Sequence, residues 1–138
     1  MGEHFTDHAS IVRYFDALAA AAPIVRLRRY GDTNENRPLL QVLIARQDYL
    51  ARLDEILARN RELANPATSE ARAREIAATN PAVVYFSYGV HGNESSSSEA
   101  ALWTAYRFRI RMKGQDFDGP VLHVMENAAG SSAAAALA

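Results

Sequence analysis

Residues 82–99 have the sequence AVVYFSYGVHGNESSSSE, which is the most informative segment for the fold class. Ala82–Tyr88 is an unbroken run of β-forming residues, which predicts a central strand covered on both faces. The serines at 95–98 predict the start of a helix, because serine hydroxyls cap exposed amide groups there. A strand followed by a short turn and a helix is typical of an α/β layered domain, in which ligands bind where strands end.

The rest of the chain predicts further helices and strands in mixed order. Apolar residues at helical spacing predict the helices, and Asn65-Pro66 is expected to cap and open the second of the two helices that follow the hairpin strands. In chain order we expect a helix over 10–22, strands over 24–30 and 39–44 joined by a turn, helices over 47–64 and 66–78, a strand over 82–88, a helix over 96–111 and a strand over 121–125. This order indicates an α/β domain with a mixed sheet.

Composition excludes several classes of partner and site. The 138 residues suit one domain, and 15 basic against 16 acidic side chains leave a net charge of -1, so neither nucleic acid nor membrane is expected as a partner. Without cysteine, a metal must be held by His, Asp or Glu. Met1–His4 is polar, unlike a signal peptide, so the compartment stays open: cytoplasmic, or periplasmic or secreted if a signal was removed.

His91 and Glu94 are the candidate metal ligands. They lie three residues apart in the turn between the predicted strand and helix, where an imidazole and a carboxylate can converge on zinc at about 2.0–2.2 Å. A structural alternative exists for both residues. His91 then closes a tight turn, and Glu94 occupies the first turn of a helix, where the helix dipole favours a carboxylate.

Three segments resemble the carboxypeptidase A-like family of zinc metallopeptidases. Residues 89–94, GVHGNE, resemble the family's first zinc motif. Residues 30–39, YGDTNENRPL, are similar to its hairpin, and residues 11–19, IVRYFDALA, to its opening helix. The resemblance spans roughly Asp7–Asn127 and keeps the three segments in the family's order.

The resemblance implies a partial α/β/α sandwich with a mixed sheet, the first half of a zinc carboxypeptidase-like fold. It implies a peptide substrate, hydrolysis of C-terminal residues, and Zn²⁺ held by His91 and Glu94. The family's third zinc ligand, general base and substrate-binding arginines lie further downstream, so we expect a truncated chain that is inactive alone. A non-catalytic α/β fragment or binding domain with a partial metal site is the alternative. A third hypothesis is a domain that binds an anion or a nucleotide at the serine-rich start of the helix.

Other histidines and aromatic residues have structural interpretations. His123 lies in the middle of a predicted strand, where a core or half-buried histidine is expected rather than a ligand. His4 and His8 are expected to form a solvated pair near the terminus. Trp103 and Tyr106 are expected on the side of their helix that faces the core, rather than on a surface that binds substrate.

Residues 1–127 are expected to be the N-terminal part of a zinc carboxypeptidase-like domain, and residues 128–138 an Ala/Ser-rich, disordered tail. A mixed sheet that stops partway leaves an exposed edge. We therefore expect self-association through that edge.

Overall fold

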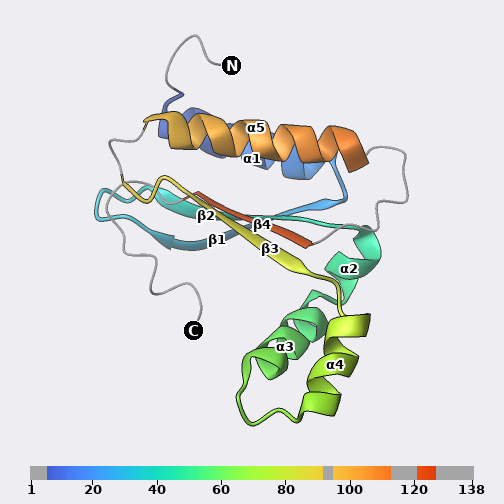
Figure 1. Ribbon diagram of the computed structural model, residues 1–138. Coiled ribbons are helices and arrows are strands. Elements are labelled where there is room, and N and C mark those ends of the chain that lie inside the picture. The colour runs from blue at the N-terminus through green and yellow to red at the C-terminus, as the bar shows by residue number, and fades with distance from the viewer. Residues whose placement is uncertain (1–5, 92–94, 113–120, 127–138) are drawn as a thin grey trace.

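The computed structural model describes residues 6–91, 95–112 and 121–126, with residues 95, 110–112 and 121–126 described through their backbone. In this part of the chain a single sheet has helices α1 (His8–Ala21) and α5 (Ser95–Met112) on one face (Figure 1). Three shorter helices project from one end of the sheet. The expected α/β fold, a partial α/β/α sandwich, is confirmed. Among the described residues, no helix is long and apolar enough to cross a membrane.

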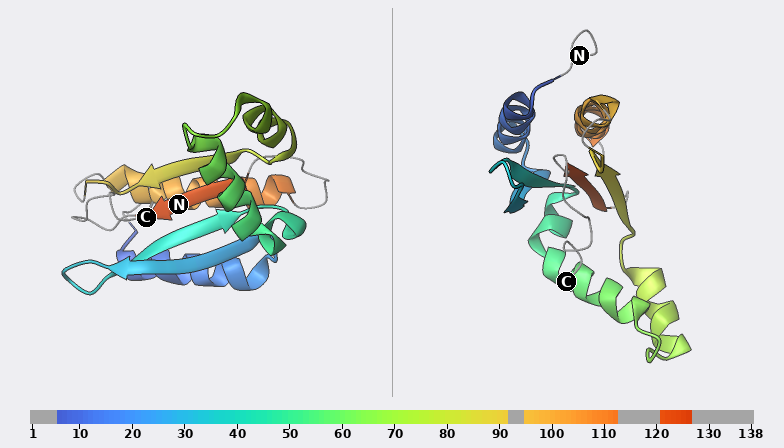
Figure 2. Two further views of the ribbon diagram at one scale, coloured as in Figure 1. Left: turned by 90° about the horizontal axis from the view of Figure 1, so that it is seen from below. Right: turned by 90° about the vertical axis from the view of Figure 1, so that its left-hand side faces the viewer.

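The described sheet is mixed and has the strand order β1-β2-β4-β3. The strands β1 (Val25–Asp32) and β2 (Pro38–Ile44) form the expected antiparallel hairpin. The last strand, β4 (Val121–Glu126), lies between β2 and β3 (Val83–Tyr88), antiparallel to the first and parallel to the second (Figure 2). The parallel pair is connected through α5, which lies over the sheet as a crossover helix does.

The main core lies between the sheet and the two helices. Alternate residues of β2, Leu40, Val42 and Ile44, are completely buried on this face. Their buried partners are Ile11, Phe15, Leu18, Ala22, Val25, Ala101, Leu102 and Ala105. Each large apolar side chain buried there stabilises the fold by about 1.5–3 kcal/mol. The expectation that residues 39–44 form a buried strand is confirmed.

The predicted helix over 47–64 is in fact two helices, α2 (Gln47–Ala51) and α3 (Leu53–Ala64). Arg52 separates them with φ −113° and ψ 28°, outside helical geometry. Leu50 and Leu53, on either side of the break, belong to a buried cluster with Leu43 and Ala45 that is separate from the core under α1 and α5. Because neither glycine nor proline marks the break, the apolar spacing alone predicted one continuous helix.

The predicted helix start at Asn65-Pro66 is also wrong. Asn65 is the C-cap of α3, and its side-chain oxygen accepts a hydrogen bond of 2.9 Å from the Ala67 amide, which holds a turn. The next helix, α4, begins only at Glu70 and runs to Thr79. Ser69 is its N-cap, with the hydroxyl accepting from the Arg72 amide at 3.3 Å.

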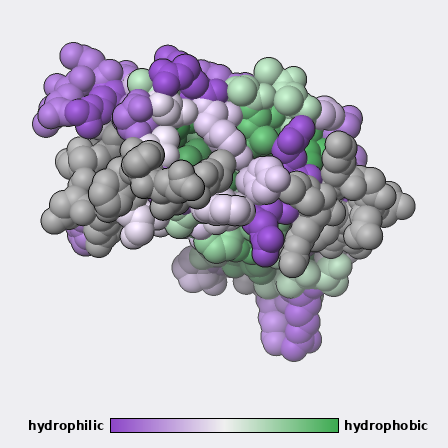
Figure 3. Space-filling view, turned by 90° about the horizontal axis from the view of Figure 1, so that it is seen from above, coloured by the Kyte–Doolittle hydropathy of each residue, from purple (hydrophilic) through white to green (hydrophobic). Residues whose placement is uncertain are grey.

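The helices α3 and α4 form a hydrophilic pair that projects from the sheet (Figure 3). Arg72 joins them, donating from Nε and Nη2 to the two carboxylate oxygens of Glu62 at 2.8 and 2.9 Å. This hydrogen bonding by the guanidinium lowers the pKa of Glu62 below its ordinary value. Arg72 also donates to Glu75 within α4, so one guanidinium connects two acidic side chains.

Two expectations about burial are wrong. The strand β3 was expected in the centre of the sheet, yet it has only one neighbouring strand in the described part, and Tyr85 is 45% exposed. Trp103 and Tyr106 were expected in the core, yet their side chains are 45% and 38% exposed. The helix α5 instead buries Ala101, Leu102 and Ala105 in the core against the sheet.

Candidate metal site

The candidate site lies at the end of the sheet where β3 and β4 finish. These two strands run parallel, and Tyr88 pairs with Glu126, so their carboxyl ends are level. The strand β2 runs the opposite way and begins at this same end with Pro38. The loop between β1 and β2 and the start of α5 therefore also belong to this end of the sheet, where ligands of α/β domains commonly bind.

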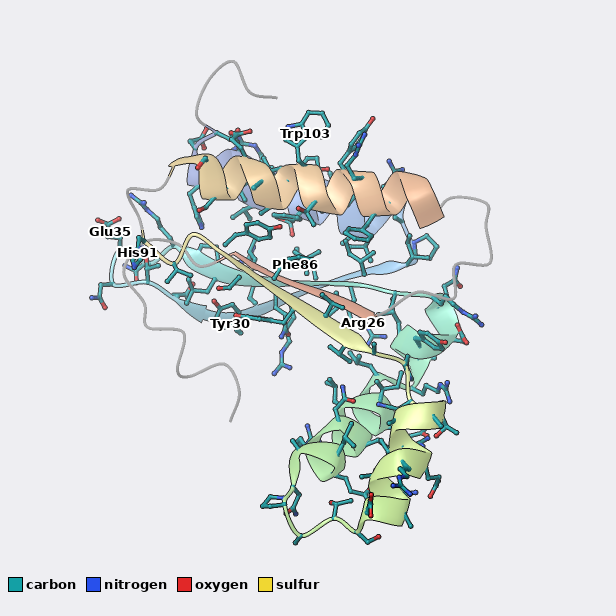
Figure 4. All side chains as sticks on the ribbon, in the orientation of Figure 1. Arg26, Tyr30, Glu35, Phe86, His91 and Trp103 are labelled. Atoms are coloured by element: carbon teal, nitrogen blue, oxygen red, sulfur yellow. The ribbon has the colours of Figure 1, made fainter. Side chains whose placement is uncertain are left out.

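His91 lies three residues beyond the end of β3, and its side chain is exposed at this end of the sheet (Figure 4). Buried Gly89 adopts φ 65°, a left-handed conformation that lets the chain turn out of the strand. The expected position of His91, directly after a strand, is confirmed. Its role as a ligand stays a prediction, because Glu94 lies outside the described residues.

Contacts of the N-terminal segment fix the elements around this end. The Glu99 carboxylate, near the start of α5, accepts a hydrogen bond of 2.9 Å from the Thr6 amide and a second from the Thr6 hydroxyl. His8 Nε2 lies 3.1 Å from the carbonyl oxygen of Pro38. The expectation of a solvated His8 is therefore wrong, while His4 lies outside the described residues. Sequence patterns gave no signal for Glu99, since its partner is 93 positions away.

The loop between β1 and β2 is closed by its own side chains. The Thr33 hydroxyl accepts from the amides of Glu35 and Arg37, each at 3.2 Å. Asn36 adopts φ 58°, which asparagine tolerates better than most residues. Arg37 forms an exposed salt bridge of 2.7 Å with Glu35. Such a pair contributes at most about 1 kcal/mol, so the turn geometry rather than the charge pair shapes the loop.

No group of three or more His, Asp or Glu side chains that could hold a metal occurs among the described residues. His123 stands in β4 in register with Leu43 and Tyr85, three positions before the strands end at Tyr88. At about 3.3 Å per residue, His123 therefore lies roughly 10 Å along the strand from the end of β3, after which His91 follows. The interpretation of His123 as a mid-strand residue, rather than a neighbour of His91, agrees with this register.

These features define an α/β domain of mixed sheet, with an exposed histidine just beyond the carboxyl end of a parallel strand. The family model described as zinc carboxypeptidase matches residues 11–116, from the first turn of α1 to beyond α5. The chain belongs to the zinc carboxypeptidase family. No curated protein matches it. Membership places the chain among metallocarboxypeptidase-like hydrolases, a family whose cofactor is Zn²⁺.

Proposed function

We propose that the chain contributes to a metallocarboxypeptidase that removes C-terminal residues from peptides, with His91 and Glu94 as two of its zinc ligands. The supporting observation is the exposed His91 immediately after the carboxyl end of β3, in a chain that the zinc carboxypeptidase model matches over 106 residues, 11–116. An imidazole and a carboxylate are both common ligands of catalytic zinc.

The donor chemistry and the position of His91 fit a zinc ion. The imidazole is exposed and stands on a short turn directly attached to a strand, so the paired strands β3 and β4 limit its movement. When bound, zinc would polarise the scissile carbonyl and lower the pKa of a water molecule. The contribution of the chain is to present the two donor side chains between β3 and α5.

We further propose that these 138 residues alone bind zinc weakly and do not hydrolyse peptides. Catalytic zinc normally has three protein ligands and one open position. The chain has four histidines, and the register of His123 and the Pro38 contact of His8 give each of those two a different environment from the turn at His91. A site with two protein ligands would hold the ion less firmly.

Calorimetric titration with Zn²⁺ tests the ligand assignment. We expect weak binding by the wild-type chain and its loss in His91→Ala and in Glu94→Gln. The matched control is His8→Gln, which removes another imidazole but none of the proposed ligands. If His8→Gln abolished binding and His91→Ala did not, the assignment would be wrong.

Peptide hydrolysis tests the activity. Peptides with a free C-terminus and the same peptides with an amidated C-terminus should both remain intact with the 138-residue chain and added Zn²⁺. Release of the last residue from the free peptide alone would establish carboxypeptidase activity and contradict the proposed inactivity. Tight zinc binding would likewise contradict it, because a third ligand within the chain would be required.

A further inference from the structure

The start of α5 lies outside the buried core. Residues 96–100 are exposed or half-buried, and Ala101 is the first buried residue that follows them. At 1.5 Å per residue, the six residues from Ser95 to Ala100 span about 9 Å. A helix end with few buried apolar contacts opens easily, so its position depends on polar contacts with neighbouring segments.

The half-buried Glu99 joins this start of α5 to the segment that precedes α1. Its Oε1 accepts a hydrogen bond of 2.9 Å from the Thr6 amide and another from the Thr6 hydroxyl. Its Oε2 is buried and accepts no hydrogen bond from the described part of the chain. Thr6 directly precedes Asp7, which caps α1 by accepting from the Ser10 amide. Glu99 therefore ties the start of one helix to the start of the other.

The same N-terminal segment contacts the sheet. His8 Nε2 lies 3.1 Å from the carbonyl oxygen of Pro38, the first residue of β2. Because β2 is antiparallel to β4 and β3 is parallel to β4, Pro38 lies at the end of the sheet where β3 leads to His91. Thr6 and His8 thus connect the start of α5 to the end of the sheet at which the His91 turn begins.

We propose that Glu99 is a positioning residue for the zinc site. By fixing the start of α5 against the N-terminal segment, it sets the spacing between the two ends of the turn that joins β3 to α5. This inference rests on the proposed function, in which that turn carries both ligands: His91 follows β3, and Glu94 directly precedes Ser95 in the sequence. Metal ligands must be held to within about 0.5 Å, so a start of α5 that moves freely weakens binding.

A second hydrogen bond attaches α5 to β3 further along the helix. The Tyr88 hydroxyl and Thr104 Oγ1 share it at 2.7 Å. Thr104 lies about 14 Å along the helix from Ser95, whereas Glu99 lies only about 6 Å from it. A contact close to the end of a helix restricts that end more strongly than a distant contact does. Glu99 is therefore better placed than Thr104 to hold the start of α5.

Positioning by Glu99 requires an oxygen that accepts from Thr6, not a negative charge. Both donors of Thr6 converge on Oε1, and the amide oxygen of a glutamine can accept the same two hydrogen bonds. A metal ligand or a counter-charge, in contrast, needs the carboxylate. The substitutions Glu99→Gln and Glu99→Ala therefore separate a positioning role from these two other roles.

Calorimetric titration with Zn²⁺, performed well below the melting temperature of each variant, tests the inference on the whole chain. Glu99→Ala should weaken binding about 10-fold, as the loss of groups that orient metal ligands does. Thr6→Val removes only the hydroxyl donor and should weaken binding less, while Glu99→Gln should bind like the wild type. Tyr14→Phe is the matched control, because it removes another hydrogen bond between α1 and α5, from the Tyr14 hydroxyl to the Leu102 carbonyl at 3.5 Å. This variant should also bind like the wild type.

Amide exchange followed by NMR in the absence of zinc gives an independent readout. The Thr6 amide and the amides of residues 99–102 should exchange about 10-fold faster in Glu99→Ala than in the wild type, because the contact that holds them is lost. In Glu99→Gln they should exchange as slowly as in the wild type. Unchanged protection of the β2 amides in both variants distinguishes this local effect from a general loss of folding.

The results separate this inference from the proposed function. If His91→Ala loses zinc binding while Glu99→Ala and Thr6→Val retain it in full, the zinc site stands and the positioning role is wrong. Thr6→Val alone decides this if Glu99→Ala does not fold. If Glu99→Gln loses binding as Glu99→Ala does, the carboxylate itself is needed, and the positioning role is again wrong. If His91→Ala binds zinc like the wild type, the ligand assignment fails and the inference falls with it.

Discussion

The substitution Ile76→Ala should release α4 while the sheet remains folded. Among the described elements, α3 is the main packing partner of α4. Ile76 is completely buried and is the only buried residue of α4, and the opposing α3 buries Leu53 and Ile56. The attachment of α4 therefore depends on one apolar side chain more than on any other.

The size of the effect follows from comparing this side chain with the polar contacts. Truncating a buried isoleucine to alanine costs about 2–5 kcal/mol. The Arg72–Glu62 pair is about 40% exposed on both sides, so solvent screens it and it holds α4 only weakly. The Asn80 side-chain amide donates to the Ile56 carbonyl at 3.2 Å, a bond of about 0.5–1.5 kcal/mol. Since most of the range for this loss lies above what a single such polar contact provides, α4 should open frequently in the variant.

Hydrogen exchange followed by mass spectrometry measures this local opening. Amides in residues 70–79 should exchange at least about 30-fold faster in Ile76→Ala, the factor that corresponds to 2 kcal/mol. Amides of β2 should keep their protection. Leu63→Ala is the control, because it truncates an apolar side chain of α3 that is already 40% exposed. If β2 lost protection as much as α4 did, the two parts would unfold together and the reasoning would be refuted.

Three further predictions concern the turns and the ion pair. Gly89→Ala places a side chain at φ 65° and should destabilise the chain by about 1–2 kcal/mol, measured by urea unfolding, and weaken Zn²⁺ binding through His91. Asn36→Val should destabilise the hairpin by a similar amount in the same assay, whereas Asn36→Gly should not. Glu62 has a lowered pKa in the folded state because Arg72 donates to it. The contribution of this carboxylate to stability is therefore present above about pH 4.3 and is lost as the pH falls through the folded pKa. In Glu62→Gln, the melting temperature should fall less steeply below that pH, and an unchanged slope would contradict this assignment.

The hairpin and the strand ends could be predicted from sequence because local patterns determine them. Alternation of Val25 and Leu27 with arginines predicts a strand with one wet face, and the structure buries Val25 while exposing Arg26. The turn-forming residues at 33–37 close the hairpin through Thr33 and Asn36 as such residues do. His91 is found after a strand because a glycine-bounded turn follows a β-forming run.

Long-range packing explains the sequence-based predictions that were wrong. The segment 82–88 has the composition of a covered strand, yet composition does not specify how many neighbours a strand has. Trp103 and Tyr106 are apolar enough for a core, but Ala101 and Ala105 occupy the side of α5 that faces the sheet. Leu50 and Leu53, on either side of the break at Arg52, belong to one buried cluster with Leu43 of the sheet, a grouping of separate elements that no local rule predicts.

The strand order has a consequence for how the sheet is completed. The strand β4 is the last to leave the ribosome among those described, yet it occupies a place between β2 and β3. Until Val121–Glu126 arrives, the hairpin and β3 have no ladder joining them, since both pair with β4. Nascent chains that end before Val121 therefore leave the edge of β2 uncovered and β3 without its partner β4. A chaperone that binds extended apolar segments would find both strands accessible until β4 is synthesised.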